Sequence, residues 1–113
     1  MFVVAIFLSF STGTSWGTFA ILVPIATALF AGADNLTMMT ISVSAVLAGA
    51  VCGDHISPIS DTTVMSSAGA QSNHINHVST QVPYVLTVAA ISFVTYIIAG
   101  FVQNVVICLV IGI

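Results

Sequence analysis

The sequence predicts an all-α transmembrane protein, a multi-pass helical bundle in which some helices are interrupted. Of its 113 residues, 58% are hydrophobic and 3% are charged, and neither Lys nor Arg occurs. A soluble domain carries about 25% charged residues, so this chain lacks the side chains to cover a water-facing surface. Disordered segments are polar and highly charged, which excludes disorder. Short polar stretches divide the apolar runs, and these stretches predict the interruptions.

Composition also excludes several classes of function. Nucleic-acid binding is excluded, because no basic side chain is present to neutralise phosphates. The positive-inside rule counts Lys and Arg, so it assigns no orientation here. Ser and His are scattered without a nucleophile, base and orienting group in one set, and we therefore expect neither an enzyme nor a bound cofactor. Cys52 and Cys108 lie within or beside apolar runs, where cysteine behaves as a small hydrophobic residue.

Residues 1–32 predict a broken helix. The apolar runs 1–10 and 18–32 are both shorter than the roughly 20 residues that span a bilayer core, and a stretch rich in Ser, Thr and Gly separates them. Its polar side chains are candidates for lining a cation or substrate site, namely Thr12, Thr14, Ser15 and Trp16. In the alternative interpretation, the glycines allow a tight helix crossing and Trp16 anchors the membrane interface.

The next predicted helix covers residues 36–52. Asp34 and Asn35 precede it, and their side-chain oxygens can cap its first turn. Small residues along this helix favour close packing against another helix: Ser42, Ser44, Ala45, Ala48, Gly49 and Ala50.

Three further segments follow towards the end of the chain. Residues 71–81 are polar with a helical apolar spacing, which predicts an amphipathic, interfacial segment. A full-length helix is predicted over residues 83–101, with Pro83 in its first turn. Gln103 and Asn104 interrupt it, and residues 105–113 predict a partial helix.

The most informative stretch is "CGDHISPISDTTVMSSAGAQ", residues 52–71. In a helix, Pro58 would clash with the carbonyl of Asp54 and leave it without a partner. We therefore predict an unwound segment and then a half-helix, together covering residues 53–70. Irregular backbone at membrane depth is tolerated only inside protein or along a wet cavity. Secondary transporters build their ion sites from interrupted helices of this kind.

The carboxylates in this stretch indicate cation and proton binding. A carboxylate inside a membrane costs roughly 2.5–3.5 kcal/mol on insertion scales, and an apolar site disfavours its charged form. A proton and a metal cation can therefore compete for one oxygen, as antiport requires. The candidate ligands of Na⁺ and H⁺ are Asp54, Asp61, Ser57, Ser60, Thr62 and Thr63. As alternatives, Asp61 only caps the half-helix, or Asp54 is paired in an interfacial loop.

The histidines give a weaker signal. His55 is either a proton carrier or a hydrogen-bonding residue, and we favour the second interpretation. His74 and His77 are three residues apart and can share a helix face. Zinc sites usually have three or four protein ligands, so we expect a polar, water-facing segment rather than a metal site.

Three motifs in order, "FSTGTSWGTFAILVPIA", "GDHISPISDTTVMSSAGA" and "NHINHVSTQVPY", closely resemble the NhaC-type Na⁺/H⁺ antiporter family. That family includes relatives that exchange malate and lactate. The resemblance covers about residues 10–84. It implies an inverted-repeat secondary transporter in the cell (inner) membrane that exchanges Na⁺ for H⁺. A Na⁺- or H⁺-coupled organic-acid antiporter is the alternative. The candidate site residues that fall on these family-like motifs are Thr12, Thr14, Ser15, Trp16, Asp54, Ser57, Ser60, Asp61 and Thr62.

Family members are several times longer, and the chain matches part of their later half. We therefore expect a fragment-like transporter segment whose partners are the lipid bilayer, Na⁺ and H⁺, together with the missing repeat or other copies of the chain. A truncated piece that functions only in assembly with other chains is a further alternative. We expect acidic residues in relatives where Asn73 and Asn76 stand here, and a basic residue near Ser79.

Overall fold

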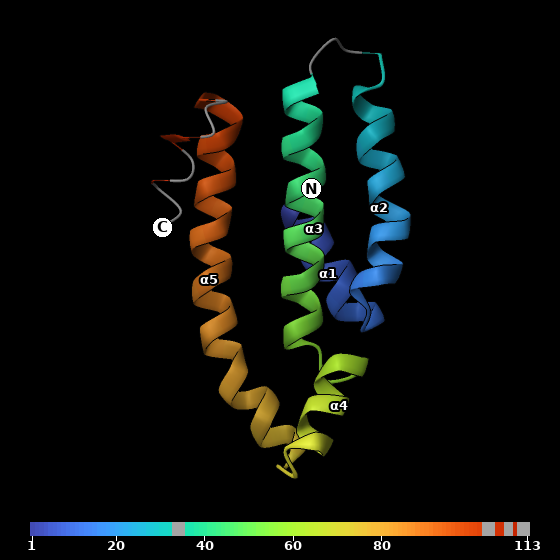
Figure 1. Cartoon of the computed structure of the whole chain (residues 1–113), viewed down its shortest axis with the longest axis vertical. Coiled ribbons are helices and arrows are strands. Elements are labelled where there is room, and N and C mark those ends of the chain that lie inside the picture. The colour runs from blue at the N-terminus through green and yellow to red at the C-terminus, as the bar shows by residue number, and fades with distance from the viewer. Residues whose placement is uncertain (33–35, 103–105, 108–109, 111–113) are drawn as a thin grey trace.

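The structure is a computed structural model that describes residues 1–32, 36–102, 106–107 and 110. These residues form helices and no β-strand, which confirms the all-helical class for the described part of the chain. The helices are α1 (Phe2–Thr12), α2 (Ser15–Phe30), α3 (Leu36–Ile56), α4 (Asp61–Gly69) and α5 (His74–Val102). Figure 1 shows α2, α3 and α5 side by side, with α4 at one end of the bundle. The inverted repeat stays a prediction.

Among the described residues, two helices are long and apolar enough to cross a membrane. They are α3, with a mean hydropathy of 1.8, and α5, with 2.3, whereas α1 and α2 are shorter apolar helices. In the most apolar stretch of α3, 28% of the residues are buried, against 6% for α5. The outer side of α5 thus presents apolar side chains without protein cover, as a lipid-facing helix does.

Glycine allows α1 to pack closely on α3. A Cβ atom on Gly49 would meet the carbonyl oxygen of Phe2, and one on Gly53 would meet that of Ile6. Helix backbones come this close only where small residues stand at the contact. The core among α1, α2 and α3 is made of small and aliphatic side chains: Ala5, Leu22, Ala26, Val46 and Ala50. This crossing brings the second half of α1 beside the last turns of α3.

The first 32 residues contain two short helices, and Gly13 and Thr14 separate them. The third helix is longer than predicted. It ends at Ile56 instead of residue 52, so the unwound segment begins at Ser57 and not at Gly53. Pro58 explains the difference, because a proline restricts the residue before it and leaves the earlier ones free to stay helical. Asp54 therefore lies inside the last turn of α3.

The polar segment 71–81 and the helix 83–101 form one helix, α5, so the separate amphipathic segment and the placement of Pro83 in a first turn are wrong. Pro83 lies inside α5, where it removes a single backbone donor, and the helix continues on both sides of it. Figure 1 shows the first turns of α5 slanting towards α4 before the helix runs alongside α3. The predicted cap at Asp34 and Asn35, the break at Gln103 and Asn104, and most of the partial helix 105–113 lie outside the described residues.

Candidate functional site

The chain leaves the helical path between α3 and α4, at Ser57–Ser60. The amide of Ser57 still donates to the carbonyl of Gly53 at 3.1 Å, and the amide of Ser60 donates back to the carbonyl of Ser57 at 3.3 Å. The side chains of Ser57 and Ser60 are fully buried. Pro58 and Ile59 between them are exposed, so the turn is anchored by its two serines, and it connects the carboxylate of Asp54 to the beginning of α4.

Asp54 is the centre of a cluster of oxygen atoms, in which Ser60 is buried and Thr62 is exposed. The side chain of Asp54 is 5% exposed. Ser60 Oγ donates to Asp54 Oδ1 at 2.6 Å, and Thr62 Oγ1 donates to Oδ2 at 3.1 Å. The two hydroxyl oxygens are themselves 2.8 Å apart. The carboxylate thus closes a ring of oxygens across the helix break.

The hydroxyl of Ser60 bonds to Asp54 instead of capping α4. Ser60 is the N-cap residue of α4, yet its side chain makes no capping hydrogen bond. A serine cap contributes about 1 kcal/mol to helix stability. Its hydroxyl is directed at Asp54 instead, so the start of α4 is built around the carboxylate.

The chain contains no Lys or Arg, and the described hydrogen bonds of His55 and His74 go to groups other than the carboxylate of Asp54. A buried charge is very unfavourable unless it is paired. Two neutral hydroxyls hydrogen-bond the carboxylate without neutralising it. A proton on the carboxyl group or a cation beside it would neutralise this charge.

The other predicted residues of this motif lie around the cluster. Ser57 Oγ donates to the carbonyl of Phe10 in α1 at 3.0 Å. Thr63 is buried in α4, and no described hydrogen bond joins it to Asp54. Asp61 is exposed and stands in the first turn of α4, where the helix dipole favours a negative charge. His55 lies 2.7 Å from the carbonyl of Val51 in its own helix, as expected for a hydrogen-bonding residue.

The predicted residues of the first break do not reach the cluster through any described hydrogen bond. Thr12 Oγ1 donates to the carbonyl of Leu8 at 2.9 Å. Thr14 caps α2 by accepting from the amide of Gly17, and Ser15 begins that helix. Trp16 is 80% exposed and meets Phe19 edge-on, with ring centroids 5.8 Å apart.

The two helix breaks nevertheless touch each other. Gly13 has a φ of 69°, and a Cβ atom there would lie 2.9 Å from Ile59 Cγ1 and 3.0 Å from its carbonyl oxygen. The bond from Ser57 to Phe10 joins the same two regions. Residues more than 40 positions apart thus form one layer of irregular backbone.

Sequence reasoning missed three residues that hold this layer together. Ser9 is buried in α1 and donates to the carbonyl of Ala50 in α3 at 2.6 Å. Ser67 and His74 hydrogen-bond to each other between α4 and α5. A serine inside the apolar run 1–10 is a usable signal for Ser9, whereas the Ser67–His74 contact depends on how the helices are placed.

Comparisons with known proteins identify the family of the chain. A profile of the Na⁺/H⁺ antiporter family matches residues 1–101. The chain belongs to that family. The resemblance predicted from the three motifs is therefore confirmed. The chain is a membrane protein of an antiporter family. The activity of that family is transport rather than enzymatic catalysis.

Individual relatives cover most of the chain. An uncharacterized protein of Haemophilus influenzae is 55% identical over 101 residues, 89% of this chain. A malate-2H⁺/Na⁺-lactate antiporter of Bacillus subtilis is 30% identical over 83% of the chain. An uncharacterized Na⁺/H⁺ antiporter of H. influenzae is 33% identical over 88%. The match covers only 19%, 20% and 22% of these relatives' own lengths, about a fifth. No solved structure matches the antiporter-family chain.

Proposed function

We propose that this chain carries the ion site of a multi-pass secondary transporter in the cell (inner) membrane that exchanges Na⁺ for H⁺. The observation that supports the proposal is the buried carboxylate of Asp54, held by the hydroxyls of Ser60 and Thr62 at a helix break, in a chain without Lys or Arg. Interrupted helices hold coupling ions in secondary transporters, and membership of the antiporter family fits that use.

In this proposal the proton and Na⁺ take turns at one group. With a proton on Asp54, the carboxyl is neutral and the hydroxyls of Ser60 and Thr62 remain hydrogen-bonded to it. When the proton leaves, Na⁺ binds the carboxylate, and the two hydroxyls turn their lone pairs towards the cation. Ser60 Oγ and Thr62 Oγ1, at 2.6 and 3.1 Å from the carboxylate oxygens, are near enough to join the same coordination shell.

The burial of Asp54 makes the exchange obligatory. An empty, ionised carboxylate in this position has lost its water and has no paired charge, which is the least favourable state of the site. A conformational change that moves the site across the membrane is then accessible only to the protonated or the Na⁺-bound form. One ion must be bound before the other is carried back.

Asp61 and the residues of the first break have supporting roles in this proposal. Asp61 is exposed at the start of α4, so it attracts cations to the entrance rather than binding them in the cluster. Thr12, Thr14, Ser15 and Trp16 shape the first break, and Gly13 packs it against Ile59. The first break is thus a wall of the site.

Sodium-driven proton flux in proteoliposomes tests the proposal. We expect Asp54→Asn to abolish the flux, because an amide can neither release a proton nor neutralise Na⁺. Asp61→Asn is the matched control and retains most of the flux. Equal flux in the wild type and Asp54→Asn would refute the assigned role of Asp54.

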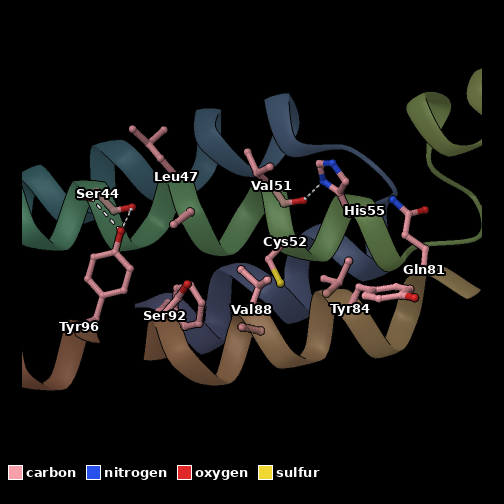
Figure 2. Close-up of a pocket in the computed structure, with 14 residues that line it drawn as sticks. Ser44, Leu47, Val51, Cys52, His55, Gln81, Tyr84, Val88, Ser92 and Tyr96 are labelled. Carbon is pink, nitrogen blue, oxygen red and sulfur yellow. Dashed lines mark hydrogen bonds between the residues drawn. The ribbon is translucent and has the colours of Figure 1, made fainter. Parts of the chain in front are cut away.

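We also propose that the chain works in an assembly with further transmembrane helices, from a missing repeat or from other copies of itself. It spans about a fifth of the length of the relatives it matches. An open groove of about 760 Å³ lies between α3 and α5, and Figure 2 shows Leu47, Val51 and Val88 along it. Gln81 lines this groove, and its buried side-chain oxygen has no hydrogen-bond partner among the described residues.

Molecular mass in detergent tests the assembly. A stable complex larger than the monomer supports it. A monomer that still exchanges ions after reconstitution would show that the chain needs no other helices.

Coupled exchange of organic acids is the second candidate function. It is favoured by the 30% identity to the B. subtilis relative named as a malate-2H⁺/Na⁺-lactate antiporter. Arginine is the usual partner of a carboxylate substrate, and here the N-terminus of a half-helix such as α4 would have to serve instead. Uptake of labelled malate or lactate that depends on Asp54 would favour this function over simple cation exchange.

A further inference from the structure

The imidazole of His74, the first residue of α5, lies between two other elements. Its Nε2 is 2.6 Å from the carbonyl oxygen of Pro58, in the break between α3 and α4. Its Nδ1 is 3.0 Å from Ser67 Oγ, on the buried side of α4. One ring thus connects the break, the half-helix after it and the long apolar helix.

The proton positions follow from the partners. A carbonyl oxygen can only accept, so Nε2 carries a proton and donates to Pro58. Ser67 Oγ is 3.0 Å from both the carbonyl of Val64 and His74 Nδ1. It donates to Nδ1 when the ring is neutral, and to Val64 when Nδ1 is itself protonated. Both contacts of the ring therefore persist in either protonation state.

The Pro58 carbonyl is a critical point of the break. It lies between Asp54 and Ser60 along the chain, in backbone that has few hydrogen bonds of its own. The break is fixed on its other side by Ser57, bonded to Phe10, and by Ile59, packed on Gly13. His74 supplies the described hydrogen bond that fixes it from the side of α5.

We propose that His74 is a positioning residue: it holds the break so that Ser60 and Thr62 stay on the carboxylate of Asp54. The inference rests on the proposed cation site and deepens it. His74 touches neither the carboxylate nor its hydroxyl ligands, so it acts on the cation through Pro58. It also makes α5 part of the site's framework, so a movement of α5 relative to α3 is transmitted to the ligand shell.

Hydrogen exchange of the reconstituted protein tests the link itself. We expect His74→Ala to speed amide exchange in residues 57–64 by about tenfold, since it removes both contacts of the ring. Ser67→Ala removes one contact and gives a smaller increase. His74→Gln, which retains a side-chain N–H donor, restores slow exchange. His77→Ala is the matched control, because His77 is one turn further along α5 and has no described side-chain hydrogen bond. Unchanged exchange in His74→Ala would overturn the inference.

Sodium dependence of proton flux tests what the link does. We expect the half-saturating Na⁺ concentration to rise about two- to tenfold in His74→Ala, the effect of one or two hydrogen bonds, with a smaller change in the maximal rate and with recovery in His74→Gln. Faster exchange with an unchanged Na⁺ dependence would overturn the positioning role. If the proposed function is wrong, the wild type shows no Na⁺-driven proton flux. The hydrogen-exchange measurement then tests the contact of His74 with the break by itself.

Discussion

Two of the helix breaks that the structure describes use their hydroxyl groups in different ways. Between α1 and α2, Gly13 turns the backbone with a φ of 69°, and the side chains of Thr12 and Thr14 bond to backbone atoms of their own segment. Between α3 and α4, the hydroxyls of Ser60 and Thr62 bond to the carboxylate of Asp54 instead. A helix break by itself is therefore a turn, and a buried carboxylate across the break makes it a candidate ion site.

The largest expected effect comes from removing both hydroxyls of the second break. A hydrogen bond to a charged group contributes about 1.5–3 kcal/mol, so Ser60→Ala with Thr62→Val should raise the half-saturating Na⁺ concentration by at least about 100-fold. Thr12→Val in the first break is the matched control and should leave it unchanged. Similar changes in both variants would show that the two breaks do not differ in function.

The contact of α1 with α3 should be the most sensitive point for stability. Gly53→Ala places a methyl group against the carbonyl of Ile6, and overpacking of this kind costs about 1–3 kcal/mol. Gly100→Ala is the control, since nothing lies within 4 Å of the added Cβ and alanine favours a helix by up to about 1 kcal/mol. Thermal unfolding in detergent should separate the two, and equal midpoints would contradict the close crossing.

Ser57→Ala tests the connection between the breaks. It removes the hydrogen bond to the carbonyl of Phe10, for which we expect a loss of about 1 kcal/mol in stability. The half-saturating Na⁺ concentration should change less than in Ser60→Ala, because the side chain of Ser57 makes no described bond to the carboxylate of Asp54. A larger effect of Ser57 on Na⁺ than of Ser60 would mean that the ligands are assigned wrongly.

Thr14→Ala should have the smallest effect. Its cap on α2 accepts from Gly17 at 3.5 Å, a long bond, so we expect a loss near 0.5 kcal/mol, the low end for an N-cap. Sodium-driven flux should stay at the wild-type level. A loss of flux with unchanged thermal stability would place Thr14 in the ion site.

Local chemistry made the second break predictable, because Pro58 disfavours helical backbone at the residue before it. Its start was misplaced, since a proline does not prevent the residues up to Ile56 from staying helical. Pro83 misled for the opposite reason: a long helix such as α5 tolerates the loss of one donor. The position of a proline in the chain therefore locates a strained point better than it locates a helix end.

Contacts between distant segments could not be predicted from the sequence. The six predicted ligands divide in the structure, with Ser60 and Thr62 on Asp54, whereas Ser57 bonds to α1 and Asp61 is exposed. All of them lie within ten residues of Asp54 in the sequence, so sequence distance does not tell which of them reach the carboxylate. The geometry of the turn decides it. The contacts of Gly13 with Ile59 and of His74 with Pro58 require the packed bundle. Cation binding at the cluster stays a prediction.

The pH dependence of Na⁺ binding tests the central claim most directly, that one carboxyl group binds either a proton or Na⁺. Equilibrium binding of radioactive Na⁺ to the reconstituted protein would be measured across a pH series. A proton and Na⁺ compete for the same oxygens, so the apparent Kd should rise as pH falls, by up to about tenfold per pH unit, and Asp54→Asn should bind no Na⁺. A Kd that is independent of pH, or Na⁺ binding that survives in Asp54→Asn, would contradict the account.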